Sequence, residues 1–474
     1  MSQTPLFLAI YLVGLAINLA SGLRRQPALA CALAFPIGLA ATVMVALLLL
    51  LAGIPYNAWT LAAGVVIPTA LPVVVSRPRL DGAALRLVAA WTAGFGLITL
   101  GLSHWNLSLM NWDSHRIVLL GGVLGHDGAL EPRMLSELHS WGVFQIVAQS
   151  LSEFTRRDYL YSLQPVFGAS FLSAFVVALW HATGRLGASG WRRTAGVALA
   201  TTALASIYVF AHHLFFIHSN LGTAVYLFGF IVLYWLAELD EDPSTLPIAF
   251  LCLLAVAIHR IETPVVALIA LVATTMTTDL PRRAITPSLA VFTVLVCGWY
   301  ILLASYVSPD SLFLTPARCV ELAAGVAGFF GWWMISRGPR LQAFNRRVPL
   351  LVSAAIVLAL AAAFATKPDH MLISLGHWMG NLVTLPHWGY SWYGIVAAVV
   401  LALFTPPPPR YRVFTLTIWL SLAYTLLLVY ARLPYRIAIL DSANRMTIHV
   451  LPLVFFYLGL KAVPPAAPQD RATV

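Results

Sequence analysis

The sequence predicts an all-α protein, a polytopic transmembrane helical bundle of about 13 to 15 spans with an amphipathic outer loop. Hydrophobic residues make up 60% of the 474 residues and charged residues only 10%, whereas a soluble domain carries about 25% charged residues. Apolar runs of roughly 17 to 25 residues recur, each long enough to cross a hydrocarbon core about 30 Å thick. Because the backbone must satisfy its own hydrogen bonds in lipid, runs of this length indicate helices.

Predicted spans follow one another along the chain, interrupted by short polar connections. The weakest are 58–76, which holds two prolines, and the short pair 245–258 and 264–278. Residues 1–464 are expected to form a single transmembrane domain, followed by a short cytoplasmic tail, 465–474. The predicted spans are 4–20, 33–53, 58–76, 85–104, 162–182, 194–212, 222–238, 245–258, 264–278, 285–306, 317–336, 348–366, 389–404, 413–431 and 446–462.

Arginines predict which loops face the cytoplasm, because cytoplasmic loops carry an excess of basic residues. The net charge is +10, and the loops after odd-numbered spans are basic except for the acidic turn Asp240-Glu241-Asp242. These loops are expected to be cytoplasmic and the N-terminus outside, so the charge indicates topology rather than nucleic-acid binding. The first twenty residues lack the basic segment and cleavage site of a signal peptide and are expected to be a retained span. The basic loop residues are Arg24, Arg25, Arg77, Arg79, Arg185, Arg192, Arg193, Arg282, Arg283, Arg337, Arg340, Arg346, Arg347, Arg410 and Arg412.

The predicted outer side holds nearly all the chemically versatile side chains. Of 13 histidines, only His181 lies near a predicted cytoplasmic end. The long polar loop 105–161 is also on the outer side, and its stretch 134–154 predicts an amphipathic helix lying in the membrane interface, with Trp and Phe at headgroup depth. The alternative for this loop is a plain structural cap over the bundle. The active surface is therefore expected to face outward.

Asp113 is the leading candidate for chemistry, in the segment Asn111-Trp112-Asp113-Ser114-His115-Arg116 just beyond a predicted span. A carboxylate in a partly desolvated cleft suits a general base that takes a proton from an acceptor hydroxyl, amine or amide. Arg116 could bind a phosphate with its planar fork. The alternative is that Asp113 only caps a helix starting near Ser114.

Two parts of the chain resemble the GT-C superfamily, integral-membrane glycosyltransferases that use polyprenyl-phosphate sugars. In the outer loop these are Asp113, the turn Gly125-His126-Asp127-Gly128 and Leu138-His139-Ser140-Trp141-Gly142; near the end it is Asn444-Arg445-Met446-Thr447-Ile448-His449-Val450-Leu451-Pro452. The resemblance implies that Asp113 is the catalytic base and that Arg445 contacts the donor phosphate.

Two further outer clusters are candidates for binding the donor. In His259-Arg260-Ile261-Glu262, Arg260 could bind phosphate and Glu262 could orient it; the alternative is a self-neutralised pair at a tight turn. Arg432, Arg436, Asp441 and Arg445 would stabilise charge on a phosphate leaving group; ordinary interfacial anchoring is the alternative. The predicted phosphate-binding residues are Arg116, Arg260, Arg436 and Arg445, and the predicted substrate-binding residues are His115, Asp127, Glu137, His139, His259 and Glu262.

No metal site is predicted. His212, His213 and His218 lack the spacing of a helical metal motif and are expected to be interface histidines or sugar contacts. The four cysteines show no CxxC spacing and are expected to pack as small apolar residues. No cofactor is required, although a divalent cation at Asp113 stays open.

The sequence and the resemblance together favour a multi-pass bacterial inner-membrane glycosyltransferase whose active face is periplasmic. Its expected partners are a polyprenyl-phosphate-linked sugar, an outer-face glycolipid or glycan acceptor, and membrane lipids. Displacement in one step would invert the anomeric centre. One alternative is a polysaccharide polymerase or ligase with a pyrophosphate-linked donor. The other is a transporter or flippase of a lipid-linked substrate, which the lack of paired broken helices disfavours.

Overall fold

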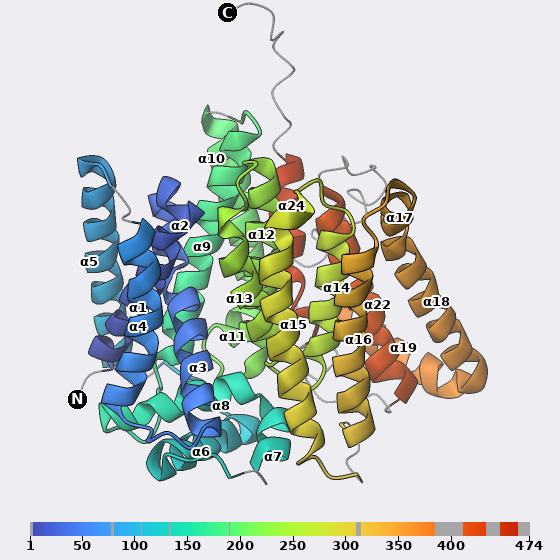
Figure 1. Ribbon diagram of the computed structural model, residues 1–474, viewed down its shortest axis with the longest axis horizontal. Helices are drawn as coiled ribbons and strands as arrows, with labels where there is room; N and C mark the ends of the chain where they lie inside the picture. The colour runs from blue at the N-terminus through green and yellow to red at the C-terminus, as the bar shows by residue number, and fades with distance from the viewer. Residues whose placement is uncertain are drawn as a thin grey trace, which may run out of the picture. The chain divides into compact units, whose positions relative to one another are not determined.

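The computed structural model of the protein describes residues 3–76, 80–105, 107–131, 134–188, 190–309, 314–383, 411–432 and 446–462. Across these residues the regular elements are helices, and strand-like pairing is confined to one isolated bridge between Leu109 and Phe216. The predicted all-α, polytopic bundle is confirmed (Figure 1). Helices long and apolar enough to cross a membrane are Ala34–Leu51, Ala58–Val75, Gly82–His104, Leu163–Arg185, Ser219–Leu239, Arg282–Ala304 and Arg340–Thr366.

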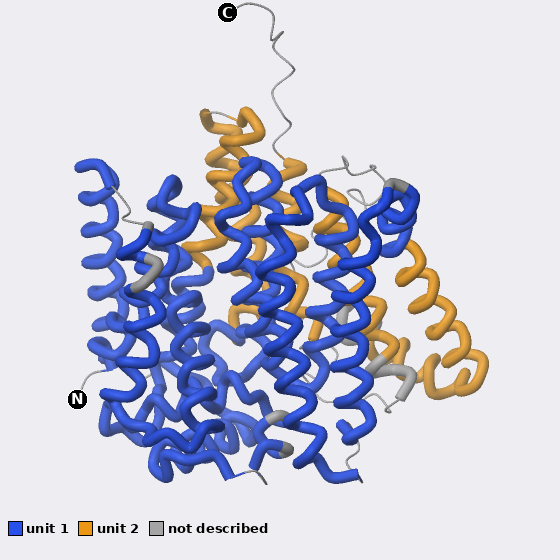
Figure 2. Tube along the Cα trace, in the orientation of Figure 1, with its two compact units in different colours: residues 1–171, 213–349 blue, residues 172–212, 350–474 orange. Residues whose placement is uncertain are grey.

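The chain forms two compact units (Figure 2). Unit 1 comprises residues 1–171 and 213–349, and unit 2 comprises residues 172–212 and 350–474. Helix α9 (Leu163–Arg185) begins in unit 1 and ends in unit 2. The contacts of the candidate site that are described below join residues of unit 1.

Most predicted spans agree with helices to within a few residues. Residues 4–20 and 348–366 coincide with α1 (Thr4–Ala20) and α18 (Val348–Thr366). The predicted span 194–212 is wrong as a single helix, because it is divided at Ile207 into α10 (Gly190–Ser206) and α11 (Tyr208–His213). The predicted span 389–404 lies outside the described residues. Helix α19 (Pro368–Val383) was not predicted at all.

Unit 1 begins with a close pair of helices, α1 and α3 (Ala34–Leu51). A Cβ atom added at Gly14 would lie 1.8 Å from the Ala34 carbonyl oxygen, and one added at Gly38 would lie 1.8 Å from the Ile10 carbonyl oxygen. The two backbones therefore touch where glycine removes the side chain, as is common between helices in membranes. The neighbouring elements are η1 (Gly22–Arg25), α2 (Pro27–Ala32), α4 (Ala58–Ser76) and α5 (Gly82–His104).

The centre of unit 1 is α12 (Ser219–Leu239), in which every residue from Ser219 to Ala237 is buried. It packs on α13 (Leu246–Ala257), just beyond the 3-10 turn η3 (Pro243–Thr245), and on α14 (Thr263–Thr275). By contrast, α4 and α5 leave most of their apolar residues exposed, which suits helices that face lipid. The remaining long helices of unit 1 are α15 (Arg282–Ala304) and α16 (Pro316–Ile335), followed by the short α17 (Pro339–Asn345).

Loops predicted to share the cytoplasmic side meet at one end of unit 1. Arg25 Nη1 lies 2.6 Å from Asp242 Oδ2, and Gln26 Nε2 donates to Asp240 Oδ2 at 2.7 Å. These contacts give a physical reason for the one acidic loop: its carboxylates pair with the polar and basic residues after the first span. Which end faces the cytoplasm stays a prediction.

The long loop that was predicted to face outward folds into helices at the other end of unit 1 (Figure 1). They are α6 (Trp112–Asp127), α7 (Met134–Trp141), α8 (Val143–Ser150) and η2 (Leu151–Thr155). The prediction of one interfacial helix over 134–154 is wrong. Gly142, with φ 117°, breaks it, and every residue of α8 is buried. The exposed apolar side chains lie instead on α6, where Trp112 is 87% exposed.

Helix α6 lies directly on α8 because two of its glycines face that helix. A Cβ at Gly121 would lie 2.5 Å from Gln149 Cβ, and one at Gly125 would lie 2.6 Å from the Ser150 carbonyl oxygen. Gly128 then ends α6 in the left-handed region, at φ 63°, which glycine adopts without steric cost. These contacts fix the helix that carries Asp113.

In unit 2, α10 packs against α24 (Leu451–Ala462). A Cβ at Gly459 would lie 2.7 Å from Leu179 Cδ2 and 3.1 Å from Ala200 Cβ, so this contact also depends on a missing side chain. Helix α22 (Arg412–Arg432) packs against both α19 and α24.

Candidate functional site

The start of α6 is joined to a segment more than a hundred residues later in the chain. Leu109 N donates to Phe215 O at 2.8 Å, and Ile217 N donates to Leu109 O at 3.1 Å. Ser114 Oγ then donates to Ile217 O at 2.7 Å. These bonds place the first turn of α6 beside the residues that lead into α12.

Asn111, not Asp113, caps α6. Its side-chain oxygen accepts a hydrogen bond from Ser114 N at 3.0 Å, and the helix begins at Trp112. The interpretation of Asp113 as the cap is therefore wrong; Asp113 lies in the first turn. A carboxylate there interacts favourably with the positive end of the helix dipole, and its side chain is 28% exposed.

The long-range contact brings His218 close to Asp113. Its Nε2 lies 3.7 Å from Asp113 Oδ2, and its side chain is only 5% exposed. The separation is within ion-pair range and slightly longer than a hydrogen bond; such contacts commonly tighten when substrate binds. The other ring nitrogen, Nδ1, accepts a hydrogen bond from Asn220 N at 3.4 Å, so His218 also caps α12.

Arg260 reaches the same helix end from the turn between α13 and α14. Its Nη1 donates to Asn220 Oδ1 at 3.2 Å. Its Nε lies 3.2 Å from Glu262 Oε1 as an ion pair without hydrogen-bond alignment, and the two side chains are 22% and 6% exposed. The Arg260–Glu262 pair is thus present, as the alternative of a self-neutralised pair at a tight turn also predicted, and Asn220 connects it to the residues around Asp113.

His259, the residue before this arginine, is buried, and its ring packs against Phe144 and Gly222. Its ring stacks on Phe144 with centroids 5.0 Å apart, and a Cβ at Gly222 would lie 2.4 Å from its Cε1 atom. Neither ring nitrogen meets hydrogen-bond geometry. Burial and, to a smaller extent, the Arg260 charge lower the pKa of His259 to about 3, against a smaller opposing effect of the Ser219 backbone. A neutral, rigid ring of this kind suits positioning rather than ligand binding.

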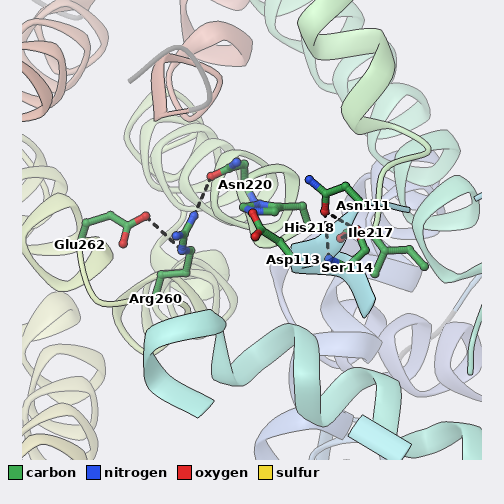
Figure 3. Close-up of polar contacts among 8 residues, drawn as sticks. All are labelled: Asn111, Asp113, Ser114, Ile217, His218, Asn220, Arg260 and Glu262. Atoms are coloured by element: carbon green, nitrogen blue, oxygen red, sulfur yellow. Dashed lines mark hydrogen bonds and ion pairs between the residues drawn. The ribbon is translucent and has the colours of Figure 1, made fainter. Parts of the chain in front are cut away.

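Figure 3 shows the resulting polar network. It runs from Asp113 through His218 and Asn220 to Arg260 and Glu262. Two carboxylates therefore lie at its ends, with a histidine and a guanidinium between them. This arrangement can place a base and a phosphate-binding cation at one end of the bundle, on three separate parts of the chain.

Arg116 and Glu137, both predicted to contact substrate, contact each other. They form an ion pair between α6 and α7, and the Arg116 guanidinium lies 5.2 Å from the centroid of the Trp141 ring. His115 is exposed beside them. Asp127 is exposed at the opposite end of α6, roughly 21 Å from Asp113 at 1.5 Å per residue, so the structure does not bring it to this network.

Several predicted residues fall outside what the structure describes. Arg436 and Arg445 lie in 433–445, and the side chain of His139 is not described although its backbone belongs to α7. Among the residues that are described, no three His, Cys, Asp or Glu side chains are grouped to hold a metal ion.

The sequence did not indicate that His218 and Asn220 lie close to Asp113. A cap signal was present, because His218-Ser219-Asn220 precedes a long apolar run. Nothing in a single sequence, however, indicates that this run starts beside residues 109–114. Comparison with family models, curated proteins and solved structures finds no significant match to this chain.

Proposed function

We propose that this membrane protein is a glycosyltransferase that moves a sugar from a polyprenyl-phosphate donor to a glycolipid or glycan acceptor at the membrane surface. In this proposal Asp113 is the general base and Arg260 binds the donor phosphate. The proposed location is a bacterial inner membrane with the site on the periplasmic face. The proposal rests on the sequence resemblance together with the network that joins these two residues.

The observation that carries the proposal is the connection of Asp113 to Arg260 through His218 and Asn220. The two candidate residues come from opposite ends of a long stretch of chain, and a purely structural cap gives no reason for them to share one network. A base must be within reach of the proton that it takes, while the leaving phosphate must meet a cation nearby.

Arg260 suits the leaving group because its guanidinium has five N–H donors. The bond to Asn220 uses one of them, and the Nε–H is not aligned on Glu262. Glu262 and Asn220 would hold the planar group in one orientation, which favours contact with two phosphate oxygens. Burial around the pair strengthens its interaction with developing negative charge.

The chemistry balances as a single displacement. The acceptor oxygen forms a bond to the anomeric carbon while the bond from that carbon to the phosphate oxygen breaks. The acceptor proton passes to the Asp113 carboxylate, and polyprenyl phosphate leaves with the bonding pair as an anion beside Arg260. In one step this route inverts the anomeric centre.

The test is sugar transfer in membranes from synthetic polyprenyl-phosphate donors, comparing wild type with Asp113→Asn. We expect the variant to lose about 100-fold or more in rate, the usual contribution of a positioned base. Asp158→Asn is the matched control, because it makes the same change at an exposed carboxylate of the same outer region. Arg260→Lys should mainly raise the KM for the donor, since lysine lacks the planar fork.

Equal transfer by wild type and Asp113→Asn would remove Asp113 as the base. Transfer only from pyrophosphate-linked donors would favour a polymerase or ligase. Movement of labelled lipid across the membrane without any transfer would favour a flippase.

A further inference from the structure

Two contacts of His218 together determine where its proton lies. Nδ1 accepts from Asn220 N at 3.4 Å, and Nε2 lies 3.7 Å from Asp113 Oδ2. A neutral imidazole carries its proton on one nitrogen only, so the nitrogen that accepts a bond is the unprotonated one. The hydrogen-bond pattern therefore assigns the proton to Nε2, facing the carboxylate.

We propose that His218 is a positioning residue for Asp113: capping α12 fixes its tautomer, and the Nε2–H then holds the Asp113 carboxylate ionised and oriented. The inference rests on the proposed function for its catalytic meaning, because Asp113 is the base there. It assigns His218 no proton transfer. A second proton on Nδ1 would oppose the Asn220 N–H, so the cap also disfavours the doubly protonated ring.

The segment that carries His218 is fixed on both sides. Ile217, the preceding residue, accepts from Ser114 Oγ of α6 at 2.7 Å. The Phe216 ring stacks on the His218 ring at 5.5 Å with an interplanar angle of 11°. The position of the imidazole relative to Asp113 is thus set by α6, by the segment itself and by α12.

Other charged or titratable groups on the same and neighbouring elements contribute to any pH dependence. They are unchanged when only His218 is substituted, so a difference between wild type and variant reports on His218. These groups are His115 and Arg116 of α6, Glu137 of α7, His213 of the same segment, and Arg260 and Glu262 of the α13–α14 turn.

The experiment measures the pH at which a hydrophobic carbodiimide modifies Asp113, read by peptide mass spectrometry. Carbodiimides add to the protonated carboxyl group, so the midpoint of labelling reports when Asp113 ionises. His218→Asn keeps a capping side chain, but its shorter amide has no atom at the position of Nε2, so the donor beside the carboxylate is lost. Loss of a donor to the ionised form favours the protonated acid, so we expect the midpoint to move to higher pH by about one unit. His218→Ser is a second capping substitution, and Asp158 labelling in the same sample is the internal control.

An unchanged Asp113 midpoint in a His218→Asn or His218→Ser protein that keeps its Tm would overturn the inference. The labelling measurement needs neither a sugar donor nor a sugar acceptor. An unchanged midpoint would therefore leave the proposed function intact, and an absence of sugar transfer would leave the labelling result valid. Where wild type transfers sugar, the acidic limb of its kcat/KM profile should move to higher pH by the same amount in His218→Asn. A uniform loss of rate without that movement would indicate a merely structural role.

Discussion

Substitution of Gly222 by alanine tests how the buried histidine positions the phosphate-binding arginine. The added Cβ would lie 2.4 Å from His259 Cε1 and 2.7 Å from His259 Nε2. Ordinary contact begins at 3.4 Å, so the ring must move by about 1 Å (3.4 − 2.4). On its own, this helical substitution should stabilise α12 by roughly 0.5–1 kcal/mol, but overpacking a filled core costs about 1–3 kcal/mol.

The consequence should appear in two measurements on detergent-solubilised protein. The Tm should fall by a few degrees, as expected for such a loss in a large unit. Sugar transfer should fall by up to about 100-fold, because Arg260 follows His259 directly and a 1 Å displacement has an effect of that order. The donor KM should rise more than kcat falls.

Two glycines provide controls. Gly229 lies on the same helix as Gly222, roughly 10 Å further along. The Cβ of Gly229→Ala would lie 3.0 Å from Cys252 Sγ of α13, so this variant should lower the Tm without affecting transfer. Gly298→Ala meets nothing within 4 Å and should be neutral or stabilising. In a His259→Ala background, Gly222→Ala should become less destabilising. If Gly222→Ala leaves the Tm unchanged, or lowers it equally with and without the His259 ring, the tight packing of His259 against Gly222 is refuted.

Two further predictions concern the same turn. Arg260→Gln leaves the Glu262 carboxylate buried without its cation and should lower the unfolding free energy by about 3 kcal/mol. The double variant Arg260→Gln, Glu262→Gln should regain most of this unfolding free energy in a thermal unfolding assay. No recovery in the double variant would contradict the pairing. The pKa of His259 is about 3, below its ordinary 6.5, so the unfolded chain binds the extra proton between these values. Stability should therefore be complete above pH 6.5 and fall as pH decreases towards 3, by up to about 1.4 kcal/mol per unit. A plot of Tm against pH should be flatter for His259→Phe than for wild type. An identical slope in the variant would assign the pH dependence of stability to other groups.

Hydropathy predicted the helices well because a span must satisfy its backbone within one continuous apolar run. The predicted 4–20 coincides with α1. The turn predicted at Gly125-His126-Asp127-Gly128 is wrong in its extent, because α6 continues to Asp127 and only Gly128 lies beyond it. Hydropathy alone placed the stretch 134–154 wrongly, since an amphipathic pattern does not distinguish a helix in the interface from one buried under another helix. The contact of Gly121 with α8 decides between these cases, and it depends on tertiary packing.

The candidate site was predictable only in part. Asp113 and the Arg260–Glu262 pair were identified from local sequence. The cap was not, because Asn111 and Asp113 are both good capping residues and a shift of two positions cannot be resolved from composition. The relation of His218 to Asp113 was not predicted, because it depends on the pairing of Leu109 with Phe216, a contact between distant segments that hydrophobic periodicity does not encode.

The network also has an order of assembly in time. Asp113 is synthesised 147 residues (260 − 113) before Arg260, which at about 5–20 residues per second corresponds to roughly 7–30 s. During that interval α6 already carries its carboxylate, while α12 cannot be fully enclosed until α13 and α14 are inserted. The nascent chain therefore completes this end of the bundle only after both short helices have left the ribosome.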